Sequence, residues 1–264
     1  MIESGEQSGA SRTAAPSSGG STPFGSGTAQ KTAQSGPAQG DPAQGDAAQG
    51  DAAQGGTAAW LAAWQPEDAP LLAARQRARE VGVGAVDEVT GATLRLLAAA
   101  SGARHVVELG TGAGVSTLWL LRGLHPDGVL TSIDPEPEHQ RLAKTGLREA
   151  GTPSGRVRLI AGRALDVLPR LSDGAYDLVL CDALAVEAVD YLPAALRLLR
   201  TGGLVVFAGA LAGGRVADST ARDPETLAAR ELARVVREEP RLVPAMLPIG
   251  PGLLVGVKVD APPL

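Results

Sequence analysis

The chain has 264 residues and a formal net charge of −5, with 24 Lys and Arg side chains against 29 Asp and Glu. This acidic balance argues against a nucleic-acid-binding protein, because such proteins gather basic side chains to meet phosphates. The longest apolar run, residues 204–212, is too short to span a membrane as a helix. Cys181 is the only cysteine, so no intrachain disulfide can form, and the first residues, MIESGEQSG, do not have the pattern of a secretory signal. We therefore expect a cytoplasmic protein that acts on neither membranes nor nucleic acids.

Residues 1–56 contain almost no large apolar side chains. They end in a repeated pentapeptide that begins at Ala38 and reads AQGDP, AQGDA, AQGDA and AQGGT. Such a segment cannot bury enough apolar surface to offset the entropy lost on ordering. The composition predicts a disordered low-complexity tail over residues 1–56, followed by one folded domain over residues 57–264.

The rest of the chain alternates between helical and strand-like patterns. Two helices are expected first, at 58–80 with an interruption near Pro66, and at 87–100. Five short apolar strands then alternate with four helices. We place the strands at 105–109, 129–133, 157–160, 176–181 and 203–207, and the helices at 115–124, 136–150, 164–171 and 188–200. This alternation predicts a parallel sheet with both faces covered.

The C-terminal part of the domain reads differently. Asp223 and Pro224 form the start of one more helix, because Asp caps a helix and Pro is tolerated at its first position. Two strand-like runs follow at 242–247 and 253–259, joined by the turn sequence PIGPG. That pattern is typical of a hairpin. The fold class expected is therefore α/β, with a mostly parallel seven-stranded sheet, one antiparallel strand and helices on both faces.

A glycine-rich turn, within the sequence VVELGTGAGVS at 106–116, carries the strongest local pattern. A buried strand ends at an acidic residue and a turn then opens a helix. Glycines let the backbone approach a ligand, and the helix start offers unpaired N–H groups. A dinucleotide fingerprint would need glycine where Val115 or Thr117 stands, so the turn and the closing hairpin both disfavour a nicotinamide oxidoreductase.

Asp134 marks the end of the next strand. Pro135 favours extended backbone at Asp134, so its carboxylate should stand at the strand tip. A carboxylate at this place can accept hydrogen bonds from ribose hydroxyls. It can equally cap the helix at 136–150, and the residue pattern alone leaves both roles open.

Several longer stretches together resemble one known family. They read VVELGTGAGVSTLWLLRGL, GVLTSIDPEPEHQRLAK, GRALDVLPRL, YDLVLCDA and LRLLRTGGLVVF. With their spacing, these stretches resemble the catechol O-methyltransferase-like family, and most of all its small actinobacterial members, over roughly residues 60–259. The resemblance implies a Rossmann-like class I methyltransferase fold, S-adenosyl-L-methionine as cofactor, and O-methylation of a small-molecule acceptor.

The resemblance also implies roles for individual residues. The cofactor-binding positions are Val86 near the methionine end, Glu108, Gly110, Thr111 and Gly112 in the turn, Ser116 at the methionine carboxylate, Asp134 at the ribose, Arg163 and Ala164 beside the adenine, and Asp182 between methionine and acceptor.

The chain departs from the family at the metal site. Metal-dependent members carry an acidic ligand after the fourth strand and an Asp-Asn pair after the fifth, which suits Mg²⁺. Here Ala208 and Gly209 stand at the positions of the pair, and Leu184 replaces a nearby carboxylate. We therefore expect no metal, and Asp182 becomes the candidate catalytic base. The alternative is a protein that binds S-adenosylmethionine with little or no catalysis.

Other residues point to structure more than to chemistry. His105, His125 and His139 fall on separate elements, and we expect each to be structural or solvent-facing. Trp60 and Trp64, four residues apart on a helix, favour a packing pair that could serve a homodimer.

Overall fold

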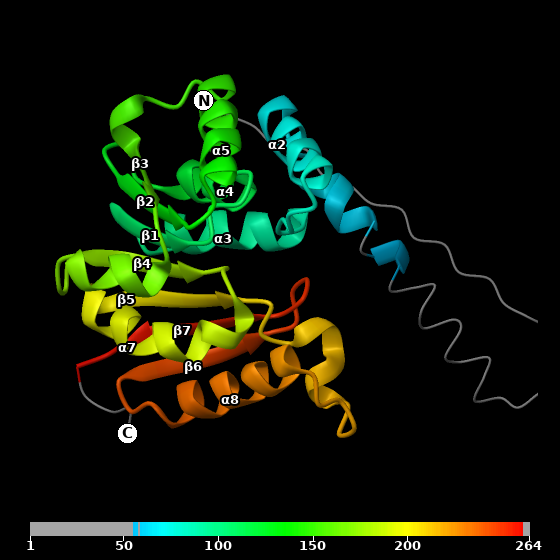
Figure 1. Cartoon of the computed structure of the whole chain (residues 1–264), viewed down its shortest axis with the longest axis vertical. Helices are drawn as coiled ribbons and strands as arrows, with labels where there is room; N and C mark the ends of the chain where they lie inside the picture. The colour runs from blue at the N-terminus through cyan, green and yellow to red at the C-terminus, as the bar shows by residue number, and fades with distance from the viewer. Residues whose placement is uncertain (1–54, 58, 261–264) are drawn as a thin grey trace, which may run out of the picture. The chain divides into compact units, whose positions relative to one another are not determined.

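The computed structural model describes residues 55–57 and 59–260 (Figure 1). All of these residues belong to one compact unit, Gln49–Leu264. Residues 55–57 and 59–64 are helical, so the expected domain boundary after residue 56 falls on helical residues. The low-complexity tail predicted for residues 1–56 lies almost wholly outside the described residues.

The helices follow the predicted order. They are α2 (Ala69–Glu80), α3 (Glu88–Ala100), α4 (Val115–Gly123), α5 (Pro137–Glu149), α6 (Ala164–Val167), α7 (Ala188–Leu198) and α8 (Pro224–Glu238). Short 3-10 helices lie at η1 (Ser154–Arg156), η2 (Leu168–Arg170), η3 (Ala185–Glu187) and η4 (Ala212–Ala217). No helix among the described residues is both long enough and apolar enough to cross a membrane.

The strands form one seven-stranded sheet in the order β3-β2-β1-β4-β5-β7-β6. They are β1 (His105–Leu109), β2 (Val129–Asp134), β3 (Val157–Ala161), β4 (Tyr176–Cys181), β5 (Leu199–Ala208), β6 (Leu242–Leu247) and β7 (Leu253–Lys258). The first five strands run parallel, and β7 is antiparallel to both of its neighbours. The predicted mostly parallel sheet with one antiparallel strand is confirmed.

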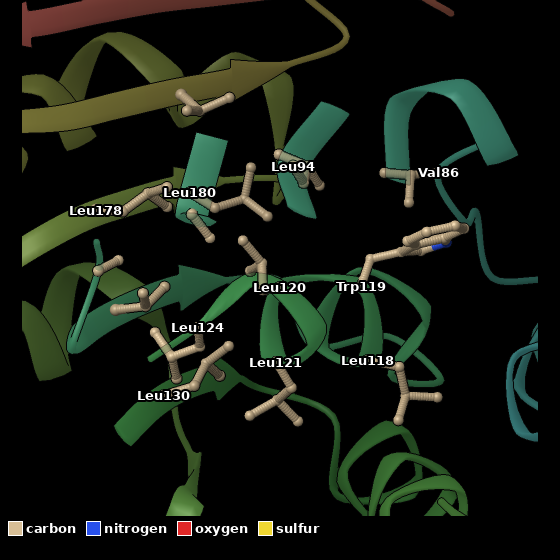
Figure 2. Packing of buried hydrophobic residues seen from close by; sticks show 14 of the residues in the cluster. Val86, Leu94, Leu118, Trp119, Leu120, Leu121, Leu124, Leu130, Leu178 and Leu180 are labelled. Atoms are coloured by element: carbon tan, nitrogen blue, oxygen red, sulfur yellow. The ribbon is translucent and has the colours of Figure 1, made fainter. Parts of the chain in front are cut away.

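The side chains of alternate strand residues feed two hydrophobic cores on opposite faces of the sheet. Val106 belongs to the core built with helices α2 to α5, and the next residue, Val107, belongs to the core built with α6 to α8. Figure 2 shows the first of these cores, with Leu120 of α4 packed toward Leu94 of α3 and toward the sheet. Helices therefore cover both faces, as the alternating pattern predicts.

Several local sequence features set the helix starts. The Asp223 side chain accepts a hydrogen bond from the Thr226 N–H at 3.0 Å, and Pro224 occupies the first turn of α8, which confirms the predicted cap. Asp87 caps α3 in the same way through the Thr90 N–H at 2.7 Å. This cap fixes the segment that leads into α3, and that segment lines the site described below.

The predicted helix at 58–80 is two separate helical segments. Residues 65–68 are not helical, and the next helix, α2, begins after Asp68, which caps it. Pro66 accounts for the break, because proline removes a backbone donor and disfavours helix at the preceding residue. The predicted helix at 164–171 is likewise divided, into α6 and the 3-10 helix η2.

The strand order reverses between β1 and β4. From β1 the chain passes to β2 and β3 on one side, and it then crosses back to place β4 on the other side of β1. In open α/β sheets, ligands bind beyond the carboxyl ends of the strands at such a point. The Asp182 N–H, just after β4, donates to the Leu109 carbonyl oxygen at 2.8 Å, which holds the ends of β4 and β1 together.

Candidate active site

A cavity of about 700 Å³ lies at the carboxyl ends of β1, β2, β4 and β5. This volume is within the range of small-molecule sites, roughly 300–1,000 Å³. The predicted site residues that line it are Val86, Gly110, Thr111, Gly112, Ser116, Asp134 and Asp182. Glu108, Arg163 and Ala164 are absent from its lining. The structure thus brings together residues that lie up to 96 positions apart in the sequence, from Val86 to Asp182.

The glycine turn is shaped by its close approach to β4. Gly110 has a φ of +93°, and a Cβ added there would lie 2.1 Å from the Asp182 carbonyl oxygen. Any other residue would be strained by both the dihedral and the clash. Helix α4 then begins at Val115 with no side-chain cap. Its first N–H groups are therefore available to an anionic ligand group at the cavity.

Glu108 lies directly beneath this turn and is fully buried. Its Oε2 atom accepts hydrogen bonds from the Thr117 hydroxyl at 2.5 Å and the Ser132 hydroxyl at 2.6 Å. Its Oε1 atom has no partner among the described residues. Burial raises the pKa of Glu108 to about 7, although its hydrogen bonds oppose the shift. A buried carboxylate oxygen without a partner is costly, and a cationic ligand group nearby would lower that cost.

Asp134 stands at the end of β2 and is only 4% exposed. One carboxylate oxygen accepts from the Gly112 N–H at 2.9 Å, and the other accepts from the Glu136 N–H at 2.9 Å. The side chain therefore braces the turn into α5 and also lines the cavity. Asp134 is not the helix cap that the sequence left open, because the N-cap residue of α5 is Glu136 and no side chain caps this helix. The ribose contact stays a prediction.

His139 is a site residue that sequence reasoning missed. Its Nδ1 atom lies 3.1 Å from Asp134 Oδ1, and its side chain lines the cavity at 22% exposure. The expectation of a merely structural or solvent-facing histidine is therefore incomplete. The first turn of α5 folds back over the tip of β2, which brings His139 to Asp134 five positions away.

Thr90 of α3 is a second residue that the sequence did not single out. It is fully buried, it lines the cavity, and its hydroxyl has no partner in the described part of the chain. Val83, Gly84 and Ala85 line the same wall. Figure 2 shows Val86, the last residue of this segment, next to the Trp119 indole of α4. Packing against α4 therefore positions this wall.

Asp182 follows β4 and is partly buried at the cavity. Burial, and then the nearby Glu108 carboxyl, raise the pKa of Asp182 to about 7. A carboxyl group that titrates near neutral pH is suited to take up a proton in general base catalysis. Perturbed carboxyls in a cleft are also a common feature of functional sites.

Ala208 ends β5 beside Asp182, and Gly209 follows it. Cys181 and Phe207 are in register on adjacent parallel strands, so the residues that follow them, Asp182 and Ala208, also stand side by side. Both Ala208 and Gly209 line the cavity. Mg²⁺ is held by several oxygen ligands, and no group of three His, Cys, Asp or Glu side chains among the described residues could hold a metal ion. The donor set at this place does not fit Mg²⁺.

Arg163 and Ala164 lie at the start of α6. Arg163 is paired with Glu187 at 2.9 Å, and Ala164 is buried in the core beneath α6. Their expected contact with the adenine stays a prediction, because the described cavity does not extend to either side chain.

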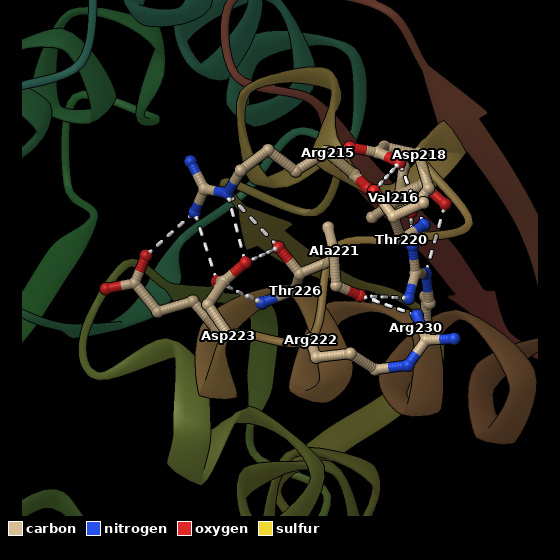
Figure 3. A network of polar contacts seen from close by, with 10 residues as sticks. Arg215, Val216, Asp218, Thr220, Ala221, Arg222, Asp223, Thr226 and Arg230 are labelled. Atoms are coloured by element: carbon tan, nitrogen blue, oxygen red, sulfur yellow. Dashed lines mark hydrogen bonds and ion pairs between the residues drawn. The ribbon is translucent and has the colours of Figure 1, made fainter.

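The loop after Gly209 is anchored to α8. The Arg215 guanidinium lies 3.1 Å from the Thr226 hydroxyl, 3.1 Å from the Glu225 carboxylate and 3.4 Å from that of Asp223. Figure 3 shows Arg215 pointing toward Asp223 and Thr226. Arg230 of α8 donates to backbone carbonyl oxygens of the same loop, including that of Val216 at 3.1 Å. These bonds fix the loop that continues from the cavity wall.

The chemistry of the cavity fits S-adenosylmethionine. This cofactor carries a sulfonium, an ammonium, a carboxylate and a ribose. The acidic side chains Asp134, Glu136 and Asp182 line the cavity, and among its described lining residues His139 is the one basic side chain. Acidic groups favour the cationic centres, and the start of α4 favours the carboxylate.

Comparison with known proteins agrees with this geometry. A family model described as O-methyltransferase matches residues 72–259. The chain belongs to the O-methyltransferase family. A relative from Mycolicibacterium smegmatis, named as an O-methyltransferase, is 54% identical over 192 residues, which are 73% of this chain and 91% of the relative.

Solved structures of related proteins support the fold and the cofactor. The crystal structure of a Corynebacterium glutamicum protein is 38% identical with a TM-score of 0.74, covering 78% of this chain and 97% of that one. The O-methyltransferase TomG of Streptomyces achromogenes, solved in complex with S-adenosylmethionine, is 30% identical with a TM-score of 0.70, covering 76% and 95%. The resemblance, the class I fold and S-adenosylmethionine as cofactor are thereby confirmed, and the protein is an O-methyltransferase that acts on a small molecule.

Proposed function

We propose that this enzyme transfers a methyl group to a hydroxyl oxygen of its acceptor without the help of a metal ion, and that Asp182 is the general base. The observation that carries the proposal is the set of side chains at the ends of β4 and β5, which we call the acceptor end of the cavity. Among the described residues that line the cavity at the ends of β4 and β5, Asp182 has the one ionisable side chain, and Ala208 and Gly209 occupy the neighbouring positions. A cofactor-binding protein without catalysis is not favoured, because the relatives are named as O-methyltransferases.

The cofactor is held by the residues around the glycine turn. We assign Asp134 to the ribose hydroxyls, and Ser116 with the first N–H groups of α4 to the methionine carboxylate. The unpartnered oxygen of Glu108 lies beneath the same turn, where it stabilises the ammonium group electrostatically. Val86 packs near the methionine end. Arg163 and Ala164 lie on the side expected for the adenine.

The bound cofactor supplies an activated methyl group. The protein therefore has to align the acceptor oxygen with that methyl group and remove the hydroxyl proton, and alignment alone contributes much of the rate. Asp182 accepts the proton when it is ionised. The hydrogen bond from its backbone N–H to the Leu109 carbonyl oxygen, at 2.8 Å, fixes the backbone of Asp182 at the cavity.

Metal independence is tested with a chelator. Methyl transfer is expected to be unchanged by EDTA and not raised by added Mg²⁺, because one carboxylate is too few ligands for this ion. The measurement is transfer of labelled methyl from S-adenosylmethionine to a phenol panel. A metal-dependent relative measured alongside shows that the chelator works. A strict Mg²⁺ requirement would contradict the proposal.

Three further expectations accompany this function. The acidic net charge of −5 supports a protein that binds no nucleic acid. Trp60 and Trp64 stack with ring centroids 6.5 Å apart and are 62% and 67% exposed, which supports a homodimer through this segment. A cytoplasmic location and a disordered tail over residues 1–56 remain predictions from composition.

A further inference from the structure

The cavity wall formed by the residues at the ends of β4 and β5 is apolar apart from Asp182, whereas the Thr90 hydroxyl lies on the α3 side, beside Gly250. Beyond the end of β4 the lining residues are Ala183 and Leu184, and beyond β5 they are Ala208 and Gly209. Pro251, in the turn between β6 and β7, also lines the cavity, and its carbonyl oxygen accepts a hydrogen bond from the Leu211 N–H at 3.0 Å. Leu184 is 61% exposed, so a large apolar side chain stands at the mouth of the cavity. A second hydroxyl that pointed toward Ala183, Leu184, Ala208 and Gly209 would find no polar side chain there.

The charges of the cavity also select among acceptors. Its described lining contains the carboxyl groups of Asp134, Glu136 and Asp182, and no Lys or Arg. An acceptor with its own carboxylate or phosphate would be placed next to Asp182 with no Lys or Arg among the described lining residues to balance it. Moving an unpaired charge into such a site is unfavourable, so neutral acceptors bind better than anionic ones.

The chemistry of Asp182 narrows the acceptor further. A phenolic hydroxyl has an ordinary pKa of about 10, and burial raises the pKa of the Asp182 carboxyl to about 7. The pKa of a phenol is then only about three units above that of the Asp182 carboxyl. An aliphatic alcohol is a far weaker acid, and the site offers no metal ligands that could acidify it.

We propose that the acceptor is a neutral, apolar phenol that presents a single hydroxyl to Asp182, and not a vicinal diol or an anionic phenol. This inference rests on the proposed function. The phenolic proton passes to the Asp182 carboxylate, and the oxygen forms a bond to the methyl carbon. The electron pair of the breaking carbon–sulfur bond stays on sulfur, which becomes a neutral thioether.

Three naphthalene probes of similar size test the proposal on the full-length protein. They are 2-naphthol, 2,3-dihydroxynaphthalene and 6-hydroxy-2-naphthoate. We expect kcat/KM for 2-naphthol to exceed that for the diol by about ten- to a hundredfold, the range over which an apolar pocket rejects an added hydroxyl. The anionic probe should be disfavoured at least as strongly. A preference for the diol or for the naphthoate would overturn the proposal.

Binding measurements separate this inference from the proposed function. Calorimetry follows S-adenosylmethionine binding to the free protein and 2-naphthol binding to the complex with S-adenosylhomocysteine. If the cofactor binds and the diol or the naphthoate is methylated while 2-naphthol is neither bound nor methylated, the inference on the acceptor fails alone. If the protein binds the cofactor but methylates none of the phenols, the proposed function fails as well.

Two designed variants test whether Leu184, Ala208 and Gly209 determine which acceptor is methylated. Leu184→Lys supplies the missing cation and should move the preference toward 6-hydroxy-2-naphthoate by about tenfold or more. Leu96→Lys, at a similarly exposed leucine of α3, is the matched control and should leave the preference unchanged. Equal responses of the two variants would contradict a role for Leu184.

A double variant introduces the side chains that metal-dependent members of the family carry after the fifth strand. Gly209 has a φ of +73°, which Asn adopts more easily than most residues, and a Cβ there meets nothing within 4 Å. Ala208→Asp with Gly209→Asn therefore adds two oxygen donors beside Asp182. We expect Mg²⁺-dependent methylation of 2,3-dihydroxynaphthalene to appear in the double variant and 2-naphthol turnover to fall. If the folded variant keeps the wild-type preference with and without Mg²⁺, these two positions do not set the acceptor class.

Discussion

The two ends of the cavity are built on different principles. At the cofactor end, Asp134 has both oxygens engaged by backbone N–H groups, and Gly110 is restricted to glycine by its contact with β4. At the acceptor end, Ala208 and Gly209 offer no functional group and Gly209 has open space around it. The contrast indicates that cofactor binding constrains many atoms of the chain at once, whereas acceptor choice depends on a few side chains that can change with little effect on the fold.

The largest effect on activity is expected from a substitution of Asp182, at the acceptor end of the cavity. Asp182→Asn keeps the size of the side chain but removes the base, so kcat should fall by about 100-fold or more, the usual contribution of a general base. Cofactor affinity, measured by calorimetry, should change little. Loss of cofactor binding with normal turnover at saturation would instead assign Asp182 to the cofactor end.

The pH profile of the same pair of proteins sharpens the assignment. With a pKa of about 7, Asp182 is protonated and inactive as a base below that pH and is ionised above it. In the wild type, kcat/KM should therefore rise with pH up to about 7 and then level off. The step near pH 7 should be absent in Asp182→Asn.

A smaller effect is expected at Asp134. Asp134→Ala should weaken S-adenosylmethionine binding by about 1.5–3 kcal/mol, the scale of hydrogen bonds to a charged group. His139→Ala removes a neighbour of Asp134 but keeps the Asp134 carboxylate, so it should weaken S-adenosylmethionine binding less than Asp134→Ala does. Calorimetry measures both, and melting temperature shows that each variant is folded. Unchanged affinity in a folded Asp134→Ala protein would remove this residue from the ribose site.

The smallest effect is expected from the low-complexity N-terminal segment. Deletion of residues 1–56 should leave cofactor affinity unchanged and alter stability by less than about 0.5 kcal/mol, the usual range for surface changes. Thermal unfolding and calorimetry on the shortened chain provide the test. A large fall in either quantity would show that the segment contributes to the folded domain.

The sequence predicts the sheet better than it predicts the site. Strands and helices follow from local periodicity, and β1 at His105–Leu109 and β4 at Tyr176–Cys181 agree with their predicted bounds. β5 begins at Leu199, four residues before its predicted start, because Leu199 pairs with Tyr176 ahead of an irregularity in the register. Only the partner strand reveals that pairing.

Site residues are harder to predict when their role depends on the path of a turn. His139 reaches Asp134 because the chain folds back after Pro135, and the helical pattern of α5 does not show this. Arg163 is engaged by Glu187, whose position depends on η3. By contrast, Gly110 and Asp182 were predicted to share a site through the resemblance, and their backbone contact follows from adjacent parallel strands.

The position of β7 has a consequence for folding during synthesis. It is the last of the described strands, yet it lies between β5 and β6, and the turn before it brings Pro251 to the cavity. During synthesis, the glycine turn and Asp182 emerge well before the strand that joins β6 to the sheet. Until β7 is in place, the edge of β5 beside Val205 and Phe207 has no partner, and such an edge can pair with another chain. A chain that stops before Leu253 would therefore be expected to aggregate instead of giving a cofactor-binding fragment.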